Sequence, residues 1–139
     1  MLQRDLSALA GRLLEAGFEV MVETSGSHDI APLPPAVVTI LDVKTPGSGE
    51  EARNFWPNLD RLGHKDAVKF VLTSEADYDF AVRVIRERDL AARTDVLLSP
   101  AWGLVDPRDL VAWMLRDRLE VRLNLQIHKY VWGPEAQKV

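Results

Sequence analysis

The feature that most constrains the fold is a repeated succession of short apolar segments and helix-length amphipathic segments. Strands are expected at 18–23, 37–42, 68–73, 95–99 and 121–126, and helices at 4–16, 51–62, 75–88 and 107–118. Parallel strands need a connection of about this length to return to the same side of a sheet. The sequence therefore predicts an α/β fold in which crossover helices join about five parallel strands, within a single domain spanning residues 1–139.

Residues typical of helix ends support these boundaries. Gly17 directly follows the first amphipathic segment and suits the left-handed position that ends a helix. Ser74 precedes the helix at 75–88 as a capping residue, and acidic residues in the first turn interact favourably with the helix dipole. Asp106 followed by Pro107 is a typical helix start.

Polar residues follow the strands at the points where the strands end. They are Glu23, Thr24 and Ser25, Asp42 and Lys44, Thr73 and Ser74, Ser99, and finally Gln126, His128 and Lys129. In parallel sheets and barrels the carboxyl ends of the strands lie at one edge, where ligands bind. We therefore expect these side chains to open toward one common edge and to form the candidate site.

The segment 42–49 is a first candidate at this edge. Asp42 and Lys44 stand on alternate residues as the strand ends, and the glycines that follow allow backbone amides to approach a ligand closely. A carboxylate in this position can accept hydrogen bonds from ribose hydroxyls. The alternative is an exposed strand end followed by a turn, and the same alternative holds for the segment 23–26.

Two segments with aromatic residues follow later strands. Trp102 comes after Ser99-Pro100-Ala101 and offers a flat face for stacking on a purine, although a single tryptophan is commonly a packing residue. The segment 126–132 is read as extended, and a solvated terminal edge strand is the alternative to a functional role. Strand-like alternation would place Gln126, His128 and Tyr130 on one face and Ile127, Lys129 and Val131 on the other.

Composition argues against several classes of function. The chain has no cysteine, which excludes disulfides, thiolate metal sites and self-held iron–sulfur clusters. Its net charge of -4 disfavours a nucleic-acid partner. No apolar run approaches the roughly 20 residues of a membrane span, and the N-terminus lacks the order of a signal peptide, so a cytoplasmic location is expected. The three histidines have no metal-ligand spacing, and no Gly-x-Ser-x-Gly elbow is present.

Five segments carry a resemblance to a known family. They are Glu-Thr-Ser-Gly at 23–26, Leu-Asp-Val-Lys-Thr-Pro-Gly-Ser-Gly at 41–49, Asp-x-Val-Lys-Phe-Val at 66–71, Leu-Ser-Pro at 98–100 and Gln-x-His-Lys-Tyr-x-Trp at 126–132. In this order and spacing they resemble 7-carboxy-7-deazaguanine synthase, a radical S-adenosylmethionine family of queuosine biosynthesis. The resemblance covers essentially the whole chain. It implies the C-terminal half of a partial radical-SAM TIM-like barrel.

The resemblance also implies an activity and its cofactors. Intact members convert 6-carboxy-5,6,7,8-tetrahydropterin, a small-molecule pterin, to 7-carboxy-7-deazaguanine, with S-adenosylmethionine, a [4Fe–4S] cluster and Mg. The family's Gly-Gly-Glu-Pro-x-Leu-Gln motif corresponds at its end to Met1-Leu2-Gln3. The Cys-x-x-x-Cys-x-x-Cys cluster motif and the magnesium ligand belong upstream of that motif. We therefore expect this chain to be inactive on its own.

The same resemblance implies contact residues, position by position. The implied contacts to S-adenosylmethionine are Thr24, Ser25, Asp42, Val43, Lys44, Ser99, Pro100, Ala101 and Trp102. The implied contacts to the pterin substrate are Gln126, His128 and Lys129, together with the end of the chain. Neither a catalytic residue nor a metal ligand is expected among these residues.

Three alternatives stay open at this stage. A non-catalytic truncated fragment would share the fold without the activity. A receiver-like phosphoacceptor domain would explain Asp42 and the hydroxyl of Thr73 at the end of the next strand, although its acidic pair and its Lys-Pro dipeptide are missing. A homodimer is the third, because an unpaired edge on the strand at 18–23 would favour self-association.

Overall fold

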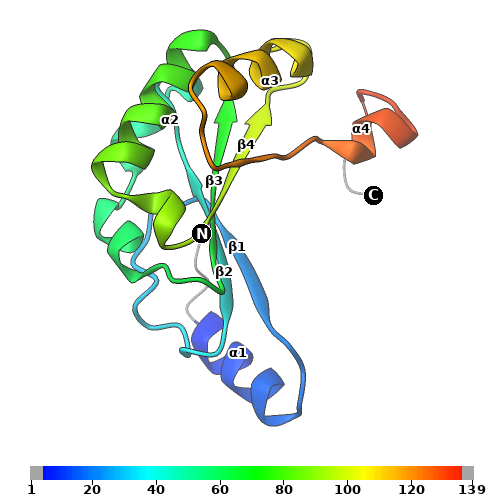
Figure 1. Cartoon of the computed structure of the whole chain (residues 1–139). Coiled ribbons are helices and arrows are strands. Elements are labelled where there is room, and N and C mark those ends of the chain that lie inside the picture. The colour runs from blue at the N-terminus through cyan, green and yellow to red at the C-terminus, as the bar shows by residue number, and fades with distance from the viewer. Residues whose placement is uncertain (1–4, 136–139) are drawn as a thin grey trace.

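The computed structural model describes residues 5–135, which form a parallel sheet flanked by helices (Figure 1). The strands are β1 (Met21–Thr24), β2 (Val38–Val43), β3 (Ala67–Leu72), β4 (Asp95–Pro100) and β5 (Arg122–Leu123). The α-helices are α1 (Leu6–Glu15), α2 (Glu75–Glu87), α3 (Pro107–Arg116) and α4 (Ile127–Trp132). Short 3-10 segments are η1 (Pro46–Ser48), η2 (Glu51–Arg53), η3 (Trp56–Arg61) and η4 (Leu90–Ala92). The segment Met1-Leu2-Gln3 lies outside the described residues.

The strands follow one another across the sheet in chain order, and every neighbouring pair is parallel. The expected α/β fold with five parallel strands is thereby confirmed. A receiver domain has the strand order 2-1-3-4-5, which reverses direction within the sheet. The observed order never reverses, so the receiver alternative is wrong, and the arrangement is that of a barrel segment.

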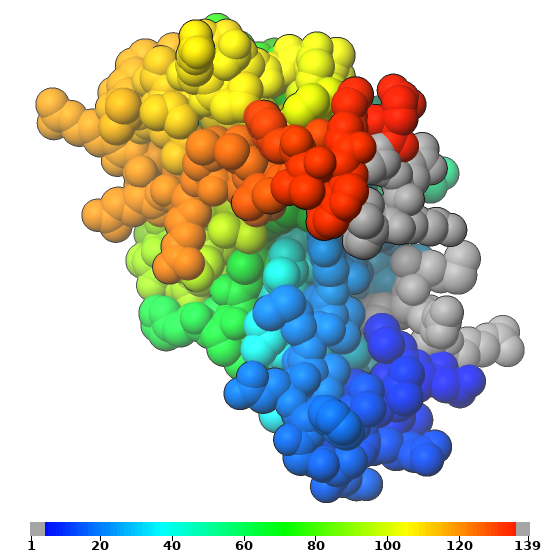
Figure 2. Space-filling model, turned by 90° about the vertical axis from the view of Figure 1, so that its right-hand side faces the viewer, coloured from blue at the N-terminus to red at the C-terminus, as the bar shows by residue number. Residues whose placement is uncertain are grey.

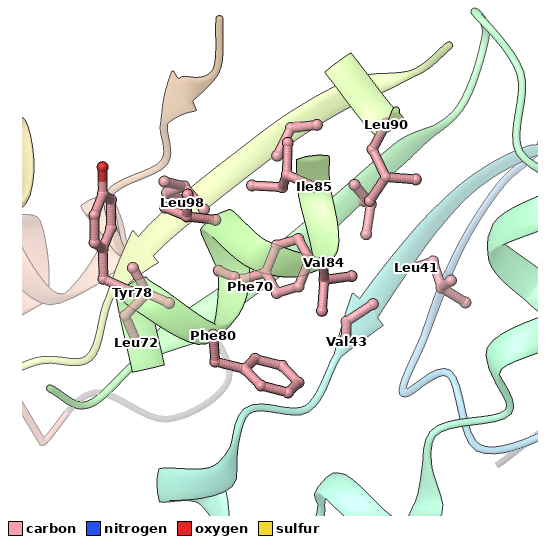
Figure 3. Packing of buried hydrophobic residues seen from close by; sticks show 14 of the residues in the cluster. Leu41, Val43, Phe70, Leu72, Tyr78, Phe80, Val84, Ile85, Leu90 and Leu98 are labelled. Atoms are coloured by element: carbon pink, nitrogen blue, oxygen red, sulfur yellow. The ribbon is translucent and has the colours of Figure 1, made fainter. Parts of the chain in front are cut away.

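The core lies between the sheet and α2 (Figure 3). Alternate strand residues such as Val43, Phe70 and Leu98 are buried on the helix side of the sheet. They meet Tyr78 and Ile85, which α2 presents at helical spacing. Each fully buried apolar side chain of this size contributes roughly 1.5–3 kcal/mol, so this layer holds the strand ends in place.

The opposite face of the sheet carries a different set of side chains. Residues that alternate with the buried ones, including Ile40, Asp42, Lys69 and Val71, are only partly buried. Figure 1 places α2 on one side of the strands and α4 on the other, and Figure 2 shows the 120–132 segment, orange to red, above the blue and cyan strands. We call this side of the sheet the open face.

Helix ends agree with the sequence where local chemistry decides them. Gly17 has φ of 85°, and the amides of Gly17 and Phe18 donate to the carbonyls of Leu14 and Leu13. This is the expected left-handed helix end. Ser74 and Asp106 both accept a hydrogen bond from an amide in the first turn of their helices.

The α-helix expected at 51–62 is wrong, because this segment forms η2 and η3 instead. Pro57 has no amide to donate. Asn54 bonds through its side chain to the backbone of Lys44, and Asn58 bonds to the amide of Ile30 and the carbonyl of His28. These side chains compete with helical hydrogen bonding and tie the segment to neighbouring loops.

The end of the chain departs furthest from expectation. The strand expected at 121–126 is limited to β5. After β5 the amide of Asn124 donates to the carbonyl of Leu98, and the hydroxyl of Ser99 donates to the carbonyl of Asn124. The extended segment expected at 126–132 is wrong, since residues 127–132 form α4. Side chains alternate between two faces in a strand but follow a period of 3.6 residues in a helix. The predicted placement of His128 and Lys129 on opposite faces therefore does not hold. Within residues 5–135, no helix is both long and apolar enough to cross a membrane.

Candidate functional site

The carboxyl ends of the strands gather the expected polar residues at one edge of the sheet. Asp42 lies in β2 and Lys44 follows it, Thr73 follows β3, Ser99 lies near the end of β4, and Gln126 comes shortly after β5. Because all five strands run in the same direction, these positions share the C-terminal edge. The prediction of a common edge is confirmed.

Asp42 provides an acceptor that the described residues leave unused. Its side chain lies on the open face and is 15% exposed. Oδ2 accepts a hydrogen bond from Nζ of Lys44 at 2.7 Å, whereas Oδ1 is buried and has no hydrogen-bond partner among the described residues. Buried carboxylate oxygens are nearly always satisfied. Oδ1 is therefore suited to a ligand hydroxyl or amine.

The backbone of Lys44 is fixed by a side chain from another segment. The amide of Lys44 donates to Oδ1 of Asn54 at 2.9 Å, and the Lys44 carbonyl accepts from Nδ2 of the same residue at 2.8 Å. Thr45, which is buried, donates through its hydroxyl to the carbonyl of Val71 at 3.2 Å. The start of the loop after β2 is thus held against both η2 and β3.

Asp77 is a buried carboxylate that joins two loops of this edge. Its Oδ1 accepts from the amide of Gly47 at 2.8 Å, and its Oδ2 accepts from the amide and the hydroxyl of Thr73 at 2.9 and 2.6 Å. Burial by itself raises the pKa of Asp77, but the hydrogen bonds from Thr73 and Gly47 outweigh it and leave the pKa below its usual value. The sequence indicated Asp77 only as a favourable residue for the helix dipole, since Gly47 lies in a distant segment.

A second ion pair lies on the open face beside Asp42. Lys69, opposite Asp42 in the register of β2 and β3, pairs through Nζ with a carboxylate oxygen of Glu23 in β1. The pair reaches across β2, so that a positive and a negative side chain lie together on the open face. Glu23 belongs to the candidate segment 23–26, whereas Lys69 was not predicted as a site residue, although it alternates with buried neighbours in β3.

The remaining hydroxyls of the predicted site are already engaged. Ser99 is buried and donates to the carbonyl of Asn124 at 2.6 Å, so it ties β4 to the chain after β5. Oγ1 of Thr24 is buried and accepts from the amide of Gly26 at 3.4 Å, and the Ser25 hydroxyl lies 3.1 Å from that of Ser27. The side chain of Val43 lies in the core, on the helix side of the sheet.

A cavity of about 400 Å³ opens at the end of β4. Pro100, Trp102, Gln126 and Tyr130 are among its lining residues. The rings of Trp102 and Tyr130 meet edge to face, with centroids 4.6 Å apart, and Oε1 of Gln126 is buried with no partner among the described residues. Aromatic walls with one free acceptor suit a flat ring that carries an N–H donor.

The residues that line the cavity do not match the predicted division between contacts to S-adenosylmethionine and contacts to the pterin. Gln126 lines the same cavity as Pro100 and Trp102, whereas His128 is exposed and Lys129 is partly buried on α4, and neither is among its lining residues. Ala101 is partly buried, and its amide donates to the carbonyl of Leu72 at 2.8 Å. The predicted end-of-chain contact lies outside the described residues. Within residues 5–135, no group of three or more His, Cys, Asp or Glu side chains could hold a metal ion.

Comparison with curated proteins identifies clear relatives. The chain is 41% identical over 150 residues to a 7-carboxy-7-deazaguanine synthase from Koribacter versatilis, and the match covers 99% of this chain and 66% of that protein. It is 36% identical over 142 residues to the protein of that name from Chlorobaculum tepidum, of which it covers 64%. The chain thus spans slightly less than two thirds of the length of these relatives. No protein-family model matches it.

A solved structure shares the fold. The crystal structure of QueE from Escherichia coli matches with a TM-score of 0.69 and 20% sequence identity, covering 88% of this chain and 51% of that one. This similarity agrees with the barrel-like order of the strands. The chain therefore has the architecture of about half of that structure.

Proposed function

This chain belongs to the 7-carboxy-7-deazaguanine synthase family, and from that premise we propose that it is the C-terminal part of such an enzyme. In the intact enzyme it would contribute to converting 6-carboxy-5,6,7,8-tetrahydropterin to 7-carboxy-7-deazaguanine in queuosine biosynthesis. Its specific role is to bind S-adenosylmethionine along the C-terminal edge of the sheet. The observation that carries this role is the pair of buried, unpartnered acceptors, Asp42 Oδ1 and Gln126 Oε1, at that edge.

The chemistry of S-adenosylmethionine complements these groups. Its ribose hydroxyls are donors for Asp42 Oδ1, and its adenine amino group is a donor for Gln126 Oε1. The adenine ring fits the aromatic wall that Trp102 and Tyr130 form in the cavity. Lys44 pairs with one oxygen of Asp42 and thereby directs its free oxygen.

Pterin contacts belong to the other side of this edge. His128, which is exposed, and Lys129, which is partly buried, lie on α4 outside the cavity lining and supply donors for the carboxylate of a small pterin. We assign Thr24 and Ser25 to the approach to S-adenosylmethionine from β1, mainly through their backbone, because their hydroxyls already have local partners.

The residues fit S-adenosylmethionine but not an iron–sulfur cluster. S-adenosylmethionine with a reduced cluster supplies the radical chemistry in the family that the sequence resembles. The 139 residues contain no cysteine, so thiolates for a cluster would have to come from residues outside them. What these residues do is bind and orient the ligand.

Isothermal titration with S-adenosylmethionine alone tests the proposed role. The chain should bind it, and Asp42→Asn and Gln126→Leu should each weaken binding by about tenfold or more, since each removes a buried acceptor. Asp95→Asn is the matched control, because Asp95 starts β4 at the opposite edge of the sheet and is half exposed in a pair with Arg122. The absence of binding, or equal losses in all three variants, would overturn the proposal.

A further inference from the structure

The loop that follows β2 carries Lys44, and α2 anchors this loop through a single side chain. We propose that Asp77 is a positioning residue for the C-terminal edge of the sheet. Its carboxylate clamps the loop after β2 to the loop after β3 and thereby fixes the position of Lys44. This inference rests on the proposed function, because it takes the C-terminal edge as the surface that faces S-adenosylmethionine. Asp77 itself is 1% exposed and touches no ligand surface.

The clamp consists of three donors that converge on one carboxylate. The amide of Gly47 donates to Oδ1, and the amide and hydroxyl of Thr73 donate to Oδ2, all within 2.9 Å. Gly47 belongs to the loop after β2 and Thr73 to the loop after β3. No other group in the described structure joins Gly47 to Thr73 in this way. Removing the carboxylate would leave two backbone amides of the edge without acceptors.

The clamp acts on Lys44 through a short and otherwise rigid path. Asn54 bonds to the amide and the carbonyl of Lys44, and the hydroxyl of Thr45 bonds to Val71. The first two residues of the loop after β2 are therefore fixed. Asp77 fixes the same loop at Gly47. Lys44 then reaches back to Asp42, whose second oxygen is the unpartnered acceptor of the site. Loosening Gly47 frees one end of the segment that directs this ion pair.

An amide in place of the carboxylate cannot restore the clamp. Asparagine offers one acceptor oxygen and one donor nitrogen, whereas the two oxygens of Asp77 each face a backbone N–H. In either orientation of the amide, one N–H would face an NH₂ group. Asp77→Asn therefore removes part of the clamp with almost no change in volume, which separates hydrogen bonding from packing.

Asp66 provides a matched control at the opposite edge of the sheet. It is 5% exposed, and its two oxygens accept from the amide of Thr39 at 2.8 Å and from the amide of Gly63 at 3.0 Å. The substitution Asp66→Asn breaks contacts of the same type, together with the ion pair between Asp66 and Lys65, but at the end of the sheet from which β3 begins. It should destabilise the fold to a similar extent without touching the loop that carries Lys44.

The test compares the wild-type chain, Asp77→Asn and Asp66→Asn under conditions in which all three are folded. Amide hydrogen exchange measured by NMR should be about tenfold or more faster at Gly47 and Lys44 in Asp77→Asn than in Asp66→Asn. Titration with S-adenosylmethionine should show at least about tenfold weaker binding for Asp77→Asn and wild-type affinity for Asp66→Asn.

The two arms separate failure of this inference from failure of the proposed function. If the wild-type chain binds S-adenosylmethionine and Asp77→Asn binds it equally well, the positioning role is overturned while the proposed function stands. If the wild-type chain does not bind the ligand, the proposed function falls and hydrogen exchange decides alone. In that case, unchanged exchange at Gly47 and Lys44 in Asp77→Asn would overturn the clamp.

Discussion

Among single residues, two buried carboxylates each accept several hydrogen bonds that hold loops in place. Asp66 and Asp77 are buried at opposite ends of β3, and each accepts hydrogen bonds from two backbone amides. Such bonds favour the charged form, and they lower the pKa of Asp77 despite its burial. Protonation of Asp77 would remove an acceptor required by the loops after β2 and β3.

The lowered pKa of Asp77 predicts how its contribution depends on pH. Because the pKa is lower in the folded than in the unfolded chain, the carboxylate stabilises the fold fully above the ordinary aspartate pKa of about 3.9, and this contribution is lost as the pH falls toward the folded pKa. The difference in unfolding free energy between the wild type and Asp77→Asn should therefore be constant near neutral pH and narrow in acid.

Urea unfolding followed by circular dichroism at a series of pH values measures this difference. Asp117, whose pKa is lowered by hydrogen bonds from Arg116 and Tyr78, titrates in both proteins and cancels in the comparison. A difference that stays constant throughout the acid range would contradict the role assigned to the Asp77 carboxylate.

Between elements, the contact of η1 with the start of α2 depends on the missing side chain of Gly47. A Cβ at this position would lie 2.1 Å from Oγ1 of Thr73 and 2.5 Å from Oδ2 of Asp77. The substitution Gly47→Ala should therefore push η1 away from α2 and cost about 1–3 kcal/mol of unfolding free energy. Gly63→Ala is the control, because its Cβ would meet nothing within 4 Å. Equal unfolding midpoints for the two variants would refute this packing argument.

The elements differ in how well the sequence predicts them, and the reason is the range of the interactions involved. The parallel strands and the helix at 75–88 follow from periodicity and from local caps such as Gly17 and Ser74, which act within one or two turns. The segment 51–62 was predicted wrongly, because Asn54 and Asn58 bond to loops far away in the chain.

The candidate site divides in the same way. Its edge could be predicted, since parallel strands bring their carboxyl ends together and Asp42 and Lys44 stand at one of them. Two contacts could not be predicted, because they join segments far apart in the chain and no local pattern indicates them. They are the hydrogen bond between Asp77 and Gly47 and the ion pair between Lys69 and Glu23. The helical form of α4 was also missed, because alternating polarity in six residues does not separate a strand from a short helix.

In the whole molecule, the sheet is a barrel segment with two ends and an open face. Among the described residues β1 pairs only with β2, so its other edge presents unpaired backbone groups. Beside this edge Met21 is 63% exposed, and Phe18 and Leu9 are exposed as well. Unpaired strand edges and adjoining apolar surface promote association between copies.

This arrangement predicts self-association of the 139-residue chain through β1, and it identifies the residue to change. Val22 is half-buried opposite Thr39, on the helix side, whereas Met21 projects from the open face. A lysine at a strand edge opposes pairing with another chain, because its charge must stay in water. Met21→Lys should therefore shift the chain from oligomer to monomer in sedimentation velocity experiments.

The control for this prediction lies on a helix. Leu115 in α3 is 73% exposed, more than Met21, so Leu115→Lys introduces the same charge and removes a similar apolar area away from the strand edge. If general surface hydrophobicity drives association, both variants will dissociate alike. If the edge of β1 drives it, only Met21→Lys will. A wild-type chain that sediments as a monomer at high concentration would mean that β1 does not act as an adhesive edge.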